Sequence, residues 1–127
     1  MQMQRLSDPF SSPENLSHAV VQAGEMLGIQ QAEVASIINF MCEGTYALFE
    51  DRVVLEPDTE TWRRAELFVR LYQALYDAMD GDGTQMVHWL HTENPALGGE
   101  PLEIMEDQGR LSDVLTLLEN IKKAKTH

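Results

Sequence analysis

With 127 residues, the chain is long enough for one domain with a hydrophobic core of its own. Its 43% of apolar residues are typical of a globular protein, and its net charge of −12 argues against nucleic acid and favours basic partners. No apolar run is long enough to span a membrane and no signal peptide is visible, so we expect a cytoplasmic protein without membrane contact. The single cysteine, Cys42, fits a reducing compartment, and we expect its thiol to be buried or half-buried.

The N-terminal part is rich in helix signals and poor in strand signals. Short helices are predicted over residues 12–28, 29–38 and 43–51. In the first of them, Ser12 can act as the N-cap, Pro13 can occupy the first helical position, and Gly28 is a C-terminal stop. The third is weakened by Gly44 near its start. The only β-like run follows it and is cut short by Pro57.

The second and third of these helices have the outline of a helix-turn-helix. Ala35 is small, as needed where two helices approach closely, and Asn39 occupies a turn position that requires a left-handed backbone. Phe40 is expected to enter the core after the turn. We assign residues 1–58 to a helix-turn-helix region.

The second helix of this pair is a poor candidate for reading DNA. Thr45, Tyr46 and Arg52 are the residues that would contact it. However, residues 41–51 contain three acids and no Lys or Arg, and residues 1–60 carry two basic against ten acidic residues, a balance of −8. Acidic groups near phosphates add repulsion. We therefore interpret the helix-turn-helix mainly as a scaffold and expect DNA binding to be weak or confined to a complex.

Residues 59–79 are predicted to form the longest helix, capped by Asp58 or Thr59. Arg63, Arg64 and Arg70 are expected to face solvent. The apolar stripe of this helix is wider than one core face needs, which predicts a homodimer that buries the excess between protomers. The stripe comprises Leu67, Phe68, Val69, Leu71, Tyr72, Leu75 and Tyr76.

A rigid corner is predicted between Trp89 and Pro101. Asn94 is driven to an extended backbone by the following proline, and the pair Gly98-Gly99 can adopt positive φ and so permit a sharp reversal. Pro101 can then open the next helix, while Trp89 is the expected buried anchor across the reversal.

Short helices are expected on both sides of this corner. The glycine-rich turn of residues 80–83 ends the long helix, and Thr84 can cap the helix that carries Trp89. After the corner, Gly109 separates a short helix from a final one that begins at about Leu111.

The chain carries no recognisable catalytic or cofactor motif. His88 and His91 are three residues apart and could share a helical face, but no third ligand is evident, so we predict no metal site. Nucleophile-elbow, P-loop and dinucleotide-binding glycine patterns are all missing. We expect a protein that is not an enzyme, has no catalytic residues and binds no cofactor.

A group of residues in the C-terminal half resembles the toxin-binding domain of the Xre/MbcA/ParS antitoxin family. The pattern consists of Trp89-Leu90, Asn94-Pro95, Leu97-Gly98, Pro101-Leu102, Gly109 and Val114. We assign residues 59–127 to this domain, and the N-terminal half resembles the family's helix-turn-helix part. The expected fold is all-α and compact, with the helix-turn-helix half packed on a C-terminal helical half.

The resemblance implies an antitoxin of a type II toxin–antitoxin system. Its partner would be a RES-domain toxin that consumes NAD⁺, and the antitoxin would cover the active-site entrance with its C-terminal segment, here "LLENIKKAKTH". The residues implicated in toxin binding are Trp89, Asn94, Leu97, Gly98, Pro101, Arg110, Lys122, Lys123 and Lys125. A corner used only for packing and a C-terminal helix whose lysines only complement its dipole remain alternatives.

Two other functions stay open. The chain could be a helix-turn-helix transcription regulator without a toxin partner, which basic residues in the second helix would have favoured. It could also be an orphan family member that serves as an interaction module. An adjacent reading frame for a RES-type toxin would separate the antitoxin from the orphan.

Overall fold

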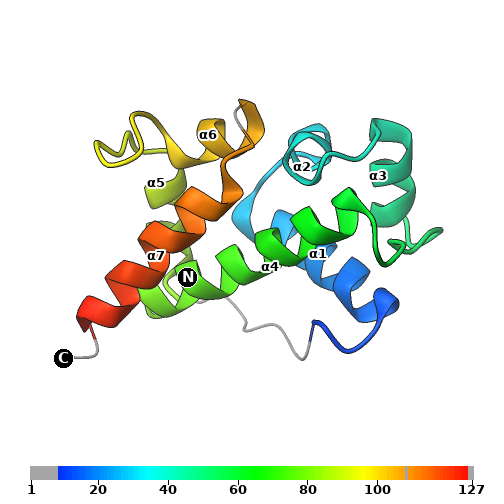
Figure 1. Ribbon diagram of the computed structural model, residues 1–127, viewed down its shortest axis with the longest axis horizontal. Helices are drawn as coiled ribbons and strands as arrows, with labels where there is room; N and C mark the ends of the chain where they lie inside the picture. Colours follow the sequence, from blue (N-terminus) through cyan, green and yellow to red (C-terminus); the bar gives the residue numbers. More distant parts are fainter. Residues whose placement is uncertain (1–8, 108, 126–127) are drawn as a thin grey trace.

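The computed structural model describes residues 9–107 and 109–125, apart from the side chains at positions 122, 124 and 125. The described chain is all-α, as predicted from the sequence (Figure 1). Its helices are α1 (Pro13–Leu27), α2 (Gln31–Ile38), α3 (Cys42–Phe49), α4 (Glu60–Ala78), α5 (Gly83–Leu90), α6 (Pro101–Asp107) and α7 (Leu111–Lys125). Within the described ranges no helix is long and apolar enough to cross a membrane.

The ends of α1 form as the local signals predict. The side chain of Ser12 accepts a hydrogen bond from the backbone N–H of Asn15, and Pro13 is the first helical residue. Gly28 ends the helix with a left-handed φ of 69°. Between these ends, the apolar face is buried against α4.

The turn between α2 and α3 also agrees with the prediction. Asn39 has a φ of 56°, which Asn tolerates better than other residues with a side chain. The backbone N–H of Phe40 donates to the carbonyl of Ala35, and Ala35 is buried where the helices meet. Phe40 itself is half-buried against the core. By contrast, Cys42 is exposed at the start of α3, so the expectation of a buried thiol was wrong.

The long helix α4 is the centre of the molecule (Figure 1). Thr59 is its N-cap and accepts from the backbone N–H of Trp62. Helix α7 packs along α4 more extensively than any other helix does, and α1 and α2 pack on its remaining faces. The buried apolar side chains of the described residues form one cluster that includes both halves of the chain.

This packing removes the reason for predicting a homodimer from the stripe on α4. Five of its seven members are fully buried within one chain, and Leu67 and Tyr76 are partly buried. The five are Phe68, Val69, Leu71, Tyr72 and Leu75. The stripe is wide because α1 and α7 cover it from different directions.

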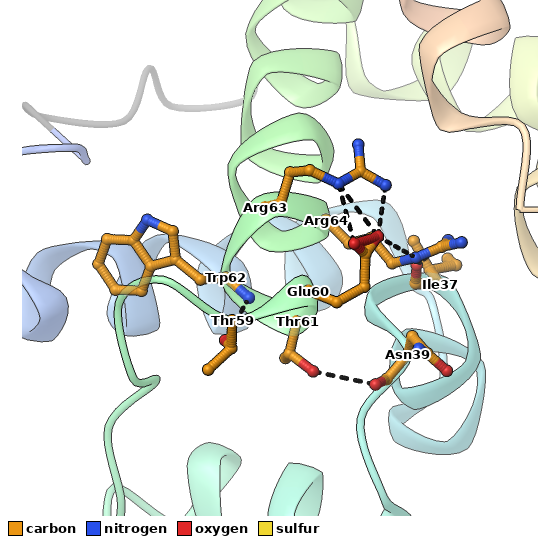
Figure 2. A network of polar contacts seen from close by, with 8 residues as sticks. All are labelled: Ile37, Asn39, Thr59, Glu60, Thr61, Trp62, Arg63 and Arg64. Carbon is orange, nitrogen blue, oxygen red and sulfur yellow. Dashed lines mark hydrogen bonds and ion pairs between the residues drawn. The ribbon is translucent and has the colours of Figure 1, made fainter.

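A polar network joins the start of α4 to the end of α2 (Figure 2). Thr61 donates its hydroxyl hydrogen to the carbonyl of Asn39 over 2.9 Å. Glu60 lies between two arginines: the pKa of its carboxyl is lowered by the hydrogen bond from Arg63, and Nε of Arg64 lies 3.4 Å away. Arg64 is only 21% exposed and also donates to the carbonyl of Ile37, so its predicted solvent-facing position was wrong.

Candidate functional site

The loop between α5 and α6 is organised around Asn94. Its backbone N–H donates to the carbonyl of Gly99 over 2.8 Å, which closes the loop as an isolated antiparallel bridge. Its own carbonyl accepts from the N–H groups of Leu97 and Gly98, at 3.0 and 2.9 Å. Its side-chain oxygen accepts from the N–H of Ala96 over 3.0 Å. One asparagine therefore holds four hydrogen bonds, which makes this corner a defined shape.

The residues after Asn94 complete the reversal. Gly98 has a φ of 81°, a conformation that side chains disfavour, whereas Gly99 does not have positive φ. The expectation for the glycine pair therefore holds for Gly98 only. Leu97 is buried beneath the loop, and Pro101 is buried at the first position of α6.

Arg110 connects this corner to the start of α7. Its Nε lies 2.8 Å from the carboxylate of Asp113, one turn into α7. Its Nη1 donates to the carbonyl of Leu97 over 3.4 Å. The guanidinium thus ties the loop to the helix, and an arginine suits this position because its planar group has donors pointing in several directions.

Arg64 supports the same junction from α4, a role that the sequence did not indicate. A Cβ atom at Gly109, whose φ is 64°, would lie 3.0 Å from the guanidinium of Arg64. Gly109 therefore allows both the left-handed turn between α6 and α7 and the close approach of Arg64. A contact between positions 64 and 109 has no local signal in the sequence.

Helix α7 leaves the corner with one face buried and one exposed. Leu111, Val114, Leu115 and Leu118 are buried against α4 and its neighbours. The exposed side chains recur at helical spacing along the opposite face and comprise Ser112, Asp113, Thr116, Glu119, Asn120 and Lys123. Glu119 lies 3.8 Å from Arg70 of α4, on the surface. The exposed face of α7 is therefore polar, and the buried face holds the helix in place against α4.

Trp89 is less buried than predicted. It lies at the end of α5, partly buried, and packs against the core. The hydrogen bonds of the reversal are made by Asn94, and Trp89 is only partly buried, so the expectation of Trp89 as a buried anchor was wrong.

The predicted toxin-contact residues are divided between two places. Asn94, Leu97, Gly98, Pro101 and Arg110 come together at the corner, with Trp89 at the end of the preceding helix. Lys123 is exposed about 20 Å further along α7, given 1.5 Å of rise per residue. The side chains of Lys122 and Lys125 lie outside the described structure. The corner and Lys123 therefore do not form one compact patch.

The three residues considered for DNA contact do not form a shared DNA-binding surface. Thr45 is fully buried, and its hydroxyl donates to the carbonyl of Met41. Its proposed contact with DNA is inconsistent with this position. Tyr46 is 43% exposed, and Arg52 is exposed but paired with Glu50 at 2.7 Å.

A carboxyl pair between α2 and α6 was not anticipated. Burial, together with the neighbouring Glu33 carboxyl, raises the pKa of Glu106 to about 8. One carboxylate oxygen of Glu106 is buried and has no hydrogen-bond partner among the described residues. The two acids are far apart in the chain, so no sequence pattern linked them. His88 and His91 are both exposed, and in the described ranges no three metal-binding side chains gather.

Comparison with known proteins finds a family match over the corner and most of α7. Residues 74–123 match the family model described as the antitoxin Xre/MbcA/ParS C-terminal toxin-binding domain. The match extends from within α4 to near the end of α7, so it includes the Asn94 corner and Arg110. A search of curated proteins finds no significant match to the chain. Residues 74–123 are therefore similar to the C-terminal toxin-binding domain of the Xre/MbcA/ParS antitoxins.

Proposed function

We propose that this protein is the antitoxin of a type II toxin–antitoxin system and that it neutralises a RES-domain, NAD⁺-consuming toxin by covering the entrance of the toxin's active site. It acts by binding and carries out no reaction itself. The observation that carries this proposal is the match of residues 74–123 to an antitoxin toxin-binding domain. The RES-type partner follows from the family resemblance.

The contacts that hold α7 against the corner and α4 support this mode of action. Arg110 ties the start of the helix to the corner, and the buried leucines hold its length on α4. A helix that is already ordered loses less conformational entropy on binding than a segment that must fold at the interface. The exposed face of α7 is therefore a suitable surface for insertion into, or closure over, a toxin pocket.

The charge at the end of α7 supports the same orientation. Lys122, Lys123 and Lys125 are the only basic cluster in an acidic chain. A dinucleotide-processing pocket that contains a catalytic carboxylate can accept an ammonium group in place of substrate charge. We propose that this lysine-bearing segment approaches the pocket, while the corner sets the angle of the helix.

Growth rescue tests the proposal directly. A RES-domain toxin from the same genome is co-expressed with the full chain, with a chain truncated after Glu119, and with a full-length variant in which Lys122, Lys123 and Lys125 are replaced by Ala. Arg52→Ala is the control, because it removes a positive charge from an exposed position outside residues 74–123.

We expect rescue by the full chain and by Arg52→Ala, and loss of rescue in the truncated and triple-alanine chains. Equal rescue by all four would indicate an antitoxin that uses another surface. If only the truncated chain fails to rescue growth, neutralisation requires the end of α7 but not the charge of its lysines. Failure of the full chain would support the orphan interpretation.

A further inference from the structure

An open apolar pocket lies outside residues 74–123, between α3, the segment that follows α3 and the start of α4. The pocket has a volume of about 330 Å³. Its walls include Phe40, Gly44, Val53, Val54, Leu55 and Glu56. All of its lining residues precede position 74, so it is separate from the surface that would bind a toxin.

Gly44 and Phe40 build one wall of this pocket. A Cβ atom at position 44 would lie 2.6 Å from the ring of Phe40, so the ring occupies space that any other residue would take. Gly44 lies inside α3, where glycine is unfavourable. The missing side chain lets the aromatic ring pack onto the helix and form an apolar wall.

The same segment contains most of the exposed large apolar side chains. Among the described residues, five large hydrophobic side chains are exposed, and Phe10 is the only one outside residues 41–54. The other four are Met41, Tyr46, Val53 and Val54, which are between 40% and 67% exposed. Of these four, Val53 and Val54 line the pocket. Exposed apolar side chains at a pocket are typical of a protein-binding surface.

The surroundings of the pocket are acidic. Residues 40–59 contain five acids and one basic residue, a balance of −4. The basic residue, Arg52, is paired with Glu50 at 2.7 Å, whereas Glu56 lines the pocket. This charge repels nucleic acid and acidic peptides and attracts lysine- or arginine-rich segments.

We propose that this pocket binds a basic segment of a partner protein that carries one aliphatic or aromatic anchor. The anchor enters the pocket between Phe40 and Val54. Basic side chains on either side of it pair with Glu56, which lines the pocket, and are attracted by the other acids of residues 40–59. The pocket includes residues at the start of α4, whereas the C-terminal end of α7 lies near the opposite end of α4, so both surfaces can be occupied together (Figure 1).

The probe is a short synthetic peptide with a central phenylalanine and lysines on both sides. Its controls are the same peptide with a central serine and the same peptide with glutamates in place of lysines. Each is titrated into the full-length protein while the amide NMR signals are followed. We expect the lysine–phenylalanine peptide to shift the amide signals of Gly44 and Val54. Both control peptides should bind with an affinity that is lower by at least about tenfold.

Three variants locate the binding. Val54→Ser removes an exposed apolar side chain from the wall of the pocket, and Glu56→Gln removes a negative charge from its lining. Each of these two variants should weaken binding by about two- to fivefold. Gly44→Ala should displace only the end of the Phe40 ring, so the fold is kept while the pocket is filled and binding is lost. Glu93→Gln, an exposed acid in the α5–α6 loop, is the matched control and should bind like wild type.

Several results would overturn the proposal. These are no binding at millimolar peptide, equal binding of the glutamate peptide, peptide-induced shifts confined to α7, or binding that is unchanged in Val54→Ser and Gly44→Ala. Shifts of Gly44 and Val54 produced by a DNA duplex would assign the surface to nucleic acid instead. If Val54→Ser converts a dimer into a monomer, the occupant is a second copy of this chain. None of these outcomes affects the antitoxin proposal, whose deciding variants change only residues 120–127.

Discussion

Asn94 shows how one side chain can set the shape of a loop. Replacement of Asn94 by Ala removes the acceptor for the Ala96 N–H but leaves the backbone bonds of the loop in place. We therefore expect the free energy of unfolding, measured by urea denaturation, to fall by about 0.5–1.5 kcal/mol. Asn94→Asp keeps the acceptor and should stay near wild type. If the aspartate variant loses as much stability as the alanine variant, the side-chain bond is not the reason.

Glu106 predicts a dependence of stability on pH. Its carboxyl has a pKa near 8 in the folded protein, because it is partly buried and faces Glu33 of α2 as well as Glu103 and Asp107 of its own helix. In the unfolded chain the pKa returns to about 4.5. The folded state therefore holds a proton that the unfolded state has lost between these values, so stability falls as pH rises through this window.

Glu106→Gln should remove most of this dependence. At pH 8 and above we expect the variant to be more stable than wild type by about 1–2 kcal/mol, less than the full pKa shift would give because solvent screens part of the charge. Urea denaturation from pH 5 to pH 8.5 measures it. Glu93→Gln, an exposed acid that is not among the groups raising the pKa of Glu106, is the control. Parallel pH profiles for wild type and Glu106→Gln would contradict the assignment.

At the scale of elements, α7 is predicted to have separate faces for stability and for binding. Leu118 is fully buried against the core, and Leu118→Ala should lower the free energy of unfolding by about 2–5 kcal/mol. Thr116 lies on the exposed face, and Thr116→Ala should change it by less than about 0.5 kcal/mol. Thermal or urea denaturation compares the two. Similar losses would mean that α7 is packed differently.

The α2–α3 pair is predicted to bind DNA only weakly when the protein is alone. Thr45 is buried, Arg52 is paired with Glu50, and α3 carries no basic residue. Without phosphate contacts from Lys or Arg, both non-specific and specific affinity are low. We expect no sequence-specific gel shift with the isolated protein at physiological salt, and propose that promoter binding, if it occurs, requires the toxin complex. A nanomolar specific shift by the protein alone would contradict this.

For the whole molecule, the homodimer stays a prediction even though its original reason no longer holds. The wide stripe on α4 is covered within one chain, so a dimer would need another apolar surface. This surface would have to lie apart from the pocket, which we assign to a basic segment of a partner. Light scattering at micromolar concentration measures the mass, and a monomer would contradict the prediction. A dimer that survives Val54→Ser would use a surface other than the pocket.

The features that sequence patterns predicted are those that depend on neighbouring residues. The caps of α1, the left-handed Asn39, the φ of Gly98 and the start of α6 at Pro101 all arise from interactions within a few positions. Such signals act through the backbone conformation of single residues and through hydrogen bonds one turn away. The helical class of the fold followed from them, and the motif residues around the corner were sufficient to indicate the toxin-binding domain model that residues 74–123 match.

The features that were predicted wrongly or not at all depend on contacts between distant parts of the chain. Arg64 was expected to face solvent, yet it contacts the carbonyl of Ile37 and packs against Gly109. Thr45 was expected on the surface and is buried, and the carboxyls of Glu33 and Glu106 meet only because α2 packs on α6. Helical periodicity shows which residues share a face. Which neighbour covers that face is decided only when the helices pack around α4, because burial depends on the full set of tertiary contacts.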